Sequence, residues 1–265
     1  MNKIKMIVTD MDGTLLNSDL ELSEKNISAI KQAIDAGIIF AIATGRMFEA
    51  AVPYAKKLDR NIPLITYNGA VVKESQSGKI LFEQTMDENI SQEIFQYGKS
   101  IGLHMHGYWG GEVYTDKLDD SSRWYSMIIR KPVIEIGDDL FNIKHKTYKI
   151  LGIAQPHLFR DQWNDLGYKF RGKVEITSSY PTFLEILTPG LNKWTAVKNL
   201  AQQYNIKNEE IMCIGDNHND LSMLKNAGVG VAVANASDEV KNIAQLLVPS
   251  NDNNGVAEAI QKALQ

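Results

Sequence analysis

Short apolar runs alternate with amphipathic segments at the start of the chain. Residues 4–9 and 38–43 are continuous apolar runs. Between them, isoleucines recur at helical spacing from Ile27 to Ile34, after Ser23, a residue type that often caps helices. Continuous rather than alternating apolarity is typical of strands buried on both faces of a parallel sheet. The pattern therefore predicts a β-α-β unit with a right-handed crossover.

The same rhythm continues to about residue 67, stops, and returns near residue 188. We predict a helix over 48–58, a strand over 63–67, a helix over 193–204, and strands over 211–214, 229–234 and 246–248, each of these last three followed by a helix. The simplest architecture is an α/β fold, a doubly wound, Rossmann-like parallel-sheet domain built from both ends of the chain.

The middle of the chain has a different pattern, more amphipathic and more aromatic. After a hairpin over 70–72 and 79–82, we expect helices over 87–101, 118–129 and after Pro156, and strands over 103–108, 112–114, 132–136, 148–153, 174–178 and 182–187. Strands adjacent in sequence favour a largely antiparallel sheet with helices on one face, an inserted α+β module. The predicted divisions are 1–82 for the first part of the core domain, 83–187 for the insert, and 188–265 for the second part.

Composition narrows the class of protein. The 265 residues are 44% hydrophobic and 23% charged, an ordinary globular balance. A net charge of −4 gives no basic excess that would favour nucleic acid or an anionic membrane. The single Cys213 excludes an internal disulfide framework, and no apolar run approaches the ~20 residues that span a bilayer. No signal peptide precedes the first strand, so we expect a cytoplasmic protein. The sequence does not indicate an oligomeric state.

Two carboxylates, Asp10 and Asp12, follow the first strand, before Gly13. They could belong to a simple surface turn. A calcium-binding EF-hand loop fails because its sixth position must be glycine and is Leu15 here. The third interpretation is a catalytic acid pair, since ligands of open α/β sheets bind at the carboxyl ends of the strands.

Other polar groups follow other predicted strands of the same sheet. They are Thr44-Gly45, Lys193 at a helix start, and the cluster Asp216, Asn219 and Asp220. Alone, Thr44 could cap a helix, Lys193 could be a solvated surface lysine, and Asp220 could only favour a helix dipole. Together with Asp10 and Asp12 they supply a nucleophile, an acid/base, a cation and phosphate donors, the complement that phosphoryl transfer needs.

These segments resemble the haloacid dehalogenase superfamily of phosphatases, in its Cof-type branch with a large class IIB cap inserted after the third strand. The similarity lies in residues 10–16, 44–46, 189–193 and 215–224, with further signatures at 68–70 and 235–236. The family more often has serine or threonine near Asn192. The resemblance spans the whole core, in the expected order, and makes the insert a cap domain.

The resemblance implies roles for the acids. Asp10 is the nucleophile that forms an aspartyl-phosphate, and Asp12 is the general acid and then the base. Mg²⁺ is held by Asp10, the Asp12 carbonyl and Asp216. Asp220 supports the metal shell through water or Lys193.

The resemblance also implies a phosphate-binding set and a supporting set. Phosphate oxygens are bound by the Met11 amide, Thr44, the Gly45 amide, Lys193 and Asn219. The supporting residues are Asp220, Arg46 and Asn68.

The leading hypothesis is a Mg²⁺-dependent phosphatase of small phosphorylated metabolites, sugar phosphates or similar. Alternatives are a phosphomutase on the same scaffold and a non-catalytic sensor of a phosphorylated ligand. A sensor has no need of both a nucleophile and an acid, which disfavours it. Free phosphate as product would separate the phosphatase from the mutase.

Substrate choice should depend on the cap. Strand alternation puts His104, His106 and Tyr108 on one face, with Trp109 beside a glycine turn. This face could bind a sugar or ring, be partly exposed, or form a dimer contact. A metal site at the two histidines lacks an evident third ligand nearby.

Overall fold

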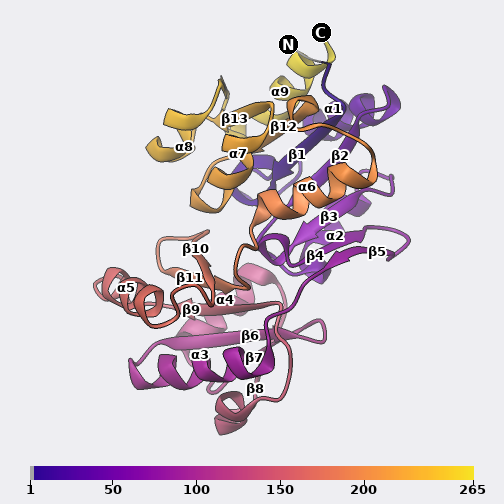
Figure 1. Ribbon diagram of the computed structural model, residues 1–265. Helices are drawn as coiled ribbons and strands as arrows, with labels where there is room; N and C mark the ends of the chain where they lie inside the picture. Colours follow the sequence, from indigo (N-terminus) through magenta and orange to yellow (C-terminus); the bar gives the residue numbers. More distant parts are fainter. Residues whose placement is uncertain (1–2) are drawn as a thin grey trace. The chain divides into compact units, whose positions relative to one another are not determined.

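The computed structural model describes residues 3–265, and its chain forms two compact units (Figure 1). The unit that we call the core runs to Glu83 and resumes at Asn192, and the unit that we call the cap is Gln84–Leu191. The prediction from sequence has these boundaries at 82/83 and 187/188.

The core unit contains eight strands in one sheet and helices on both faces. Its strands are β1 (Met6–Asp10), β2 (Ile39–Ala43), β3 (Pro63–Thr66), β4 (Val71–Glu74), β5 (Ile80–Glu83), β12 (Ile211–Gly215), β13 (Val229–Val233) and β14 (Leu246–Val248). Its helices are α1 (Glu24–Asp35), α2 (Phe48–Lys56), α6 (Lys193–Gln203), α7 (Leu221–Asn226), α8 (Asp238–Ile243) and α9 (Gly255–Leu264).

The strand order is β14-β13-β12-β1-β2-β3-β4-β5. Pairing is parallel from β14 to β3, and β4 and β5 add an antiparallel edge. The doubly wound α/β prediction is therefore confirmed. In register, Thr9 lies opposite Ile214 and Asp10 lies opposite Ala43. The carboxyl ends of β12, β1 and β2 thus meet at one level, which brings together the polar residues that follow them.

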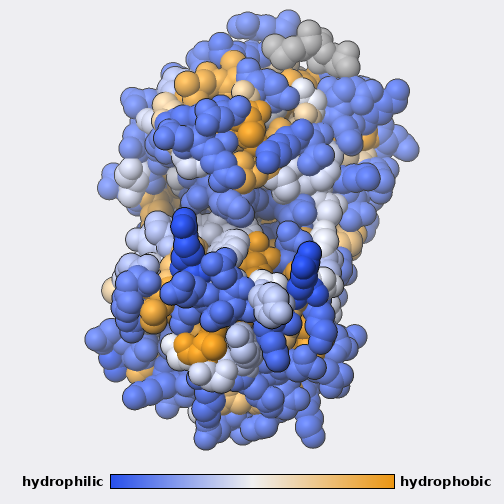
Figure 2. Space-filling model, turned by 60° about the vertical axis from the view of Figure 1, so that its left-hand side comes forward, coloured by the Kyte–Doolittle hydropathy of each residue, from blue (hydrophilic) through white to orange (hydrophobic). Residues whose placement is uncertain are grey.

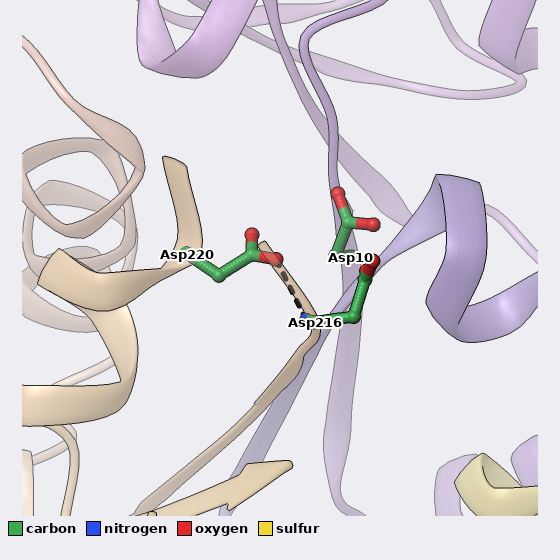
Figure 3. Close-up of side chains that lie close together, drawn as sticks. All are labelled: Asp10, Asp216 and Asp220. Carbon is green, nitrogen blue, oxygen red and sulfur yellow. Dashed lines mark hydrogen bonds between the residues drawn. The ribbon is translucent and has the colours of Figure 1, made fainter. Parts of the chain in front are cut away.

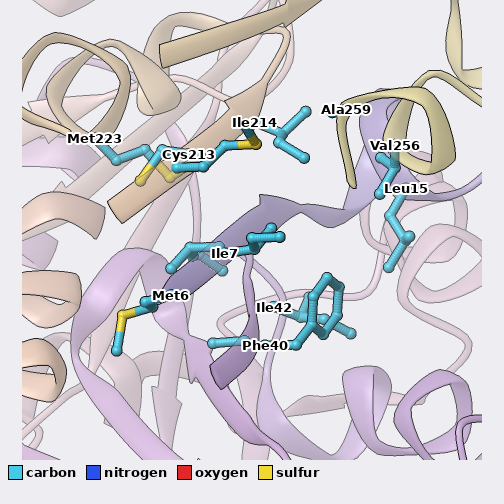
Figure 4. Close-up of a cluster of buried hydrophobic side chains, with 14 of the residues drawn as sticks. Met6, Ile7, Leu15, Phe40, Ile42, Cys213, Ile214, Met223, Val256 and Ala259 are labelled. Atoms are coloured by element: carbon cyan, nitrogen blue, oxygen red, sulfur yellow. The ribbon is translucent and has the colours of Figure 1, made fainter. Parts of the chain in front are cut away.

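Helices cover both faces of this sheet. Neighbouring residues of a strand point to opposite faces, and in β12 Cys213 points toward Met223 of α7, whereas Ile214 points toward Ala259 of α9 (Figure 4). Because both faces of these strands are covered, residues such as Ile7 and Ile214 are fully buried, and the strands appear in the sequence as continuous apolar runs. Cys213 is an inert core residue, since burial raises the pKa of its thiol.

Two helix starts fit their sequence signals. Ser23 caps α1 by accepting the Asn26 N–H at 3.2 Å, as predicted. Asn192 caps α6 by accepting the Thr195 N–H at 3.1 Å, and the Thr195 hydroxyl accepts the Asn192 N–H in return. Asparagine thus provides the cap, and Lys193 becomes the first residue of the helix.

The cap unit is an α+β module around a six-stranded sheet. Its strands are β6 (His104–Trp109), β7 (Glu112–Thr115), β8 (Val133–Glu135), β9 (Lys149–Ile153), β10 (Glu175–Thr177) and β11 (Phe183–Leu187), and its helices are α3 (Glu88–Ser100), α4 (Asp120–Ile129) and α5 (Phe159–Lys169). The order is β10-β11-β9-β6-β7-β8, antiparallel except for the parallel pair β7 and β8. The predicted antiparallel sheet is confirmed.

The expectation that all helices of the cap cover one face is wrong. A side chain at Gly107 would meet Phe95 of α3, whereas its neighbours His106 and Tyr108 contact Tyr125 of α4. Because successive strand residues alternate between faces, α3 and α4 lie on opposite faces of this sheet. Periodicity gives a helix an apolar side but does not say which sheet face receives it.

The face in Figure 2 is mostly hydrophilic, with hydrophobic residues in scattered groups. This agrees with the apolar side chains lying in the interior of each unit. In the part of the chain that the structure describes, no helix is both long and apolar enough to cross a bilayer.

Candidate active site

Three carboxylates converge at the carboxyl ends of β1 and β12: Asp10, Asp216 and Asp220 (Figure 3). One oxygen from each lies within 4.8 Å of the others. Asp10 is the last residue of β1 and is 5% exposed. Burial, followed by repulsion from Asp220, raises the pKa of Asp10 well above its usual range. Burial and Asp220 likewise raise the pKa of Asp216 to about 7. The site therefore needs positive charge to hold these acids ionised.

Lys193 supplies part of that charge. Its side chain is fully buried, and its Nζ lies 2.5 Å from Asp10 Oδ1 and 2.6 Å from Asp220 Oδ1. The two carboxylates more than offset the effect of burial and raise the pKa of Lys193. A solvated surface lysine is thus excluded.

Asp220 connects Lys193 to the backbone at the end of β12. Its Oδ1 accepts from Lys193, and its Oδ2 accepts the backbone N–H groups of Asp216 and Asn217 at 2.9 and 3.1 Å. Both of its oxygens are therefore engaged, which leaves Asp10 and Asp216 as the carboxylates better placed to bind a cation.

The residues present fit a magnesium ion. If all three acids are ionised, the Lys193 ammonium offsets one of three negative charges, and the remainder would be balanced by a divalent cation. The donors are all oxygen atoms, which hard cations prefer.

The loop after Asp10 holds Asp216 from the other side. Thr14 donates its hydroxyl to Asp216 Oδ1 at 2.6 Å. Gly13 has a φ of +79°, and a Cβ added there would lie 2.6 Å from Asp216 Oδ2. This position requires glycine both for its left-handed backbone and for the close approach of a carboxylate.

Asp12 lies apart from the buried cluster. Its side chain is 43% exposed, and Arg46 holds both of its oxygens, with Nε to Oδ2 at 2.8 Å and Nη2 to Oδ1 at 2.5 Å. Arg46 is itself buried, with its guanidinium 5.5 Å from the centre of the Tyr54 ring. The two acids of the first motif therefore have different surroundings, since Asp10 pairs with Lys193 and Asp12 with Arg46.

Thr44 does not cap the following helix, because Met47 occupies the cap position of α2. The Thr44 hydroxyl instead accepts the Arg46 N–H at 3.0 Å, in a buried turn after β2. The helix-cap alternative for Thr44 is therefore excluded.

A left-handed turn, Tyr67–Gly69, joins several parts of the site. All three residues have positive φ, at 52°, 55° and 113°. Asn68 donates its N–H to the Thr44 carbonyl at 3.0 Å and accepts the Asn219 side-chain amide at 3.0 Å. A Cβ at Gly69 would lie 2.5 Å from the carbonyl oxygen of Asn192. The turn thus fixes Thr44, Asn219 and the start of α6 relative to one another, at a cost in backbone strain.

Sequence reasoning missed two residues that fix the loop after Asp10 and the Asp216 carboxylate. They are Thr14, which holds Asp216, and Asn235, which donates to the Gly13 carbonyl at 2.7 Å. Both lie in segments noted for their resemblance to family motifs, but no spacing argument pairs residues so far apart in the chain.

The cap residues lie as the strand alternation predicts, with His104, His106 and Tyr108 on one face of β6. His106 and Tyr108 are buried, and the tyrosine hydroxyl is hydrogen-bonded to that of Tyr125. Trp109 points to the other face and stacks on Tyr114. Their part in substrate choice stays a prediction.

The His104 and His106 Nε2 atoms lie 2.9 Å apart, so one of the two rings donates a hydrogen bond to the other. Ser122 Oγ lies 3.0 Å from His104 Nε2, and Asp119 lies 3.4 Å from its Nδ1. Among residues 3–265, one group of three or more histidine, cysteine, aspartate or glutamate side chains is placed to bind a metal, and it consists of Asp10, Asp216 and Asp220.

Comparison with known proteins agrees with this geometry. The family of haloacid dehalogenase-like hydrolases matches residues 7–260. A Bacillus subtilis relative, the 5-amino-6-(5-phospho-D-ribitylamino)uracil phosphatase YwtE, is 32% identical over 98% of this chain and 98% of its own. Phosphatase YwpJ from the same organism is 28% identical, over 98% of this chain and all of its own length.

Solved structures give the same result. A haloacid dehalogenase-like hydrolase from Bacteroides thetaiotaomicron superposes with a TM-score of 0.87 at 30% identity, over 98% of this chain and 99% of that one. One from B. subtilis has a TM-score of 0.88 at 28% identity, over 97% and 99% of the two chains. The relatives named above are phosphatases, enzymes that hydrolyse phosphoric monoesters. The chain therefore belongs to the haloacid dehalogenase-like hydrolases and is a phosphoric monoester hydrolase.

Proposed function

We propose that the protein is a Mg²⁺-dependent phosphatase that hydrolyses small phosphorylated metabolites through a phosphorylated Asp10. The observation that carries this proposal is the buried Lys193, whose ammonium contacts Asp10 at 2.5 Å. Burial and Asp220 raise the pKa of Asp10, and the Lys193 ammonium acts in the opposite direction, so it favours the Asp10 anion that attacks phosphorus.

The reaction has two steps. An Asp10 oxygen forms a bond to phosphorus while the bond to the leaving alkoxide breaks, and water then displaces Asp10 from the phosphoryl group. In the first step Asp12 gives a proton to the alkoxide, and in the second it takes one from the attacking water. Arg46 contacts both Asp12 oxygens, so it orients this carboxylate.

Asp10, Asp216 and the Asp12 carbonyl would hold the magnesium ion, which when bound would neutralise charge on the transferring phosphoryl group. Thr44, the Gly45 and Met11 amides, Lys193 and Asn219 would bind phosphate oxygens. Asp220 acts through Lys193, with which it shares a 2.6 Å ion pair. Asn68 acts through Asn219, because its side-chain oxygen accepts a hydrogen bond from the Asn219 amide.

The substrate class is a phosphate monoester of a sugar or polyol. Support comes from relatives that cover nearly the whole chain and are named for 5-amino-6-(5-phospho-D-ribitylamino)uracil, whose phosphate sits on a ribityl chain. The net charge of −4 and the single cysteine support a cytoplasmic enzyme of small metabolites rather than of nucleic acids.

Phosphate release from a generic aryl phosphate tests the proposal. We expect release to require Mg²⁺, to stop with excess chelator, and to be abolished by Asp10→Asn. Asp19→Asn is the matched control, because Asp19 is an exposed acid nearby in sequence. Full activity of Asp10→Asn, or activity in chelator, would refute the proposal.

A panel of phosphorylated sugars and polyols then separates the alternatives. A phosphatase releases free phosphate from a subset of the panel. An isomerised sugar phosphate without free phosphate would identify a phosphomutase, and binding without turnover would identify a sensor.

A further inference from the structure

Three asparagine side chains bind the loop that follows Asp10. Each donates its Nδ2 to a different backbone carbonyl: Asn235 to Gly13 at 2.7 Å, Asn26 to Leu15 at 3.1 Å, and Asn251 to Leu16 at 2.9 Å. The donors come from α1, from the turn after β13 and from the loop after β14, so the loop is held by parts of the core that lie far apart in sequence.

Asn235 differs from the other two in its surroundings. Asn26 and Asn251 are 1% and 8% exposed, whereas Asn235 lies on the surface. Its Oδ1 also accepts the Asn251 N–H at 3.0 Å. Truncating a buried asparagine leaves unpaired backbone groups in the interior, but an exposed amide can be replaced by water at small cost to folding. Asn235 is therefore the one whose local effect can be measured apart from stability.

The carbonyl that Asn235 binds lies at the most constrained point of the loop. Gly13 is the left-handed residue whose Cα approaches the Asp216 carboxylate, and its carbonyl belongs to the same peptide as the N–H of Thr14. Thr14 in turn donates its hydroxyl to Asp216 at 2.6 Å. A rotation of this peptide would shift both groups that contact Asp216, and it would shift Asp12, which directly precedes Gly13.

We propose that Asn235 is a positioning residue for the phosphoryl-transfer site. Its amide fixes the Gly13–Thr14 peptide, and through that peptide it sets the orientation of the Asp216 carboxylate and the place of Asp12. The inference rests on the proposed function, but it concerns a residue outside the set that touches phosphate or metal.

Position 235 requires asparagine because its side-chain N–H group donates to the Gly13 carbonyl. Aspartate has the same shape and keeps an oxygen for the Asn251 N–H, but it would set a carboxylate oxygen against the Gly13 carbonyl oxygen. Asn235→Asp therefore removes one of the two contacts and keeps the other. Asn235→Ala removes both without adding a charge.

The matched control is Asn226→Ala. Asn226 is also exposed, and its Nδ2 donates to a backbone carbonyl, that of Ser222, at 2.8 Å. It lies at the end of α7, so it tests whether losing any such surface hydrogen bond has the same effect.

The experiment measures Mg²⁺ binding to the full chain by calorimetry, together with kcat and KM for an aryl phosphate and the melting temperature. For Asn235→Ala and Asn235→Asp we expect Mg²⁺ affinity and kcat each to fall about tenfold, the equivalent of one lost hydrogen bond. KM should change little, and the melting temperature should stay within about 2 °C of the wild type. Asn226→Ala should match the wild type throughout.

Either of two results would overturn the inference. One is wild-type Mg²⁺ affinity and kcat in Asn235→Asp. The other is a loss of melting temperature in both variants that accounts for the loss of activity, which would make Asn235 merely structural. If the wild type itself released no phosphate, the proposed function would fail, while the calorimetric comparison would still test the positioning role.

Discussion

Replacing Lys193 with methionine removes the one buried cation of the acid cluster while keeping a long side chain. In the wild type its Nζ contacts Asp10 and Asp220 at 2.5 and 2.6 Å, and the side chains of all three are no more than 7% exposed. Removing one partner of a buried ion pair costs about 3–5 kcal/mol, because the remaining charge is left unpaired. We expect Lys193→Met to lose that much free energy of unfolding at pH 8 without added metal.

The loss should depend on pH in a definite direction. Lys193 lowers the pKa of Asp10, which burial and Asp220 raise, so in the variant that pKa rises further above the unfolded value of about 3.9. A group with a raised folded pKa binds more protons in the folded state, so its stability is present at low pH and is lost as pH rises. The deficit relative to the wild type should therefore be smaller at pH 5 than at pH 8.

Urea unfolding followed by circular dichroism measures these differences. The matched control is Lys198→Met, which changes an exposed lysine on the same helix and should leave stability within about 0.5 kcal/mol of the wild type. A deficit below about 1 kcal/mol for Lys193→Met, or one that does not change with pH, would refute the ion-pair account.

Three further outcomes follow from other contacts. Arg46→Met should lower kcat about 10- to 100-fold with little change in KM, because Asp12 loses both hydrogen bonds that orient it. Asn68→Gly keeps a residue that tolerates a φ of 55° but removes the acceptor for Asn219, so inhibition by inorganic phosphate should weaken about 5- to 10-fold. Burial holds the pKa of His106 well below its usual range, so the free energy of unfolding should fall by up to about 1.4 kcal/mol per unit as pH drops below about 6.5, in urea titrations.

Each of these outcomes has a control. Arg46→Lys keeps the charge without the two-pronged contact, and wild-type kcat in that variant would contradict the orienting role. Asn205→Gly changes an exposed asparagine with a φ of 54° and should leave phosphate inhibition unchanged. His106→Gln should flatten the acid limb of the stability profile, and an unchanged slope would contradict the assignment to this histidine.

The sequence predicts the positions of those site residues that come directly after strands of the core sheet. Asp10 and Asp216 could be brought together from sequence because parallel strands end at one edge of a sheet. The expectation that Lys193 follows a strand of the same sheet is wrong, because Lys193 begins α6 after β11, a strand of the cap sheet. The two acids of the first motif could not be separated in this way. Their spacing in the sequence does not show that Asp10 is buried beside Lys193 whereas Asp12 is partly exposed beside Arg46.

Long-range side-chain contacts were beyond the reach of periodicity. The contact from Asn235 to Gly13 spans 222 positions, and a hydrogen bond of this kind leaves no period in the sequence. The same holds for α4, whose amphipathic pattern predicts a helix but not the sheet face that it covers. Such features depend on loop geometry and register, which arise only when the whole sheet has formed.

The central claim is that Asp10 carries the phosphoryl group between substrate and water. Acid quenching within the first turnover of a labelled aryl phosphate, followed by peptide mapping, tests it directly, because acyl phosphates persist in acid. We predict label on the peptide that contains Asp10 in the wild type and none in Asp10→Asn. Release of phosphate by the wild type with no labelled protein, or with label on another residue, would contradict the account.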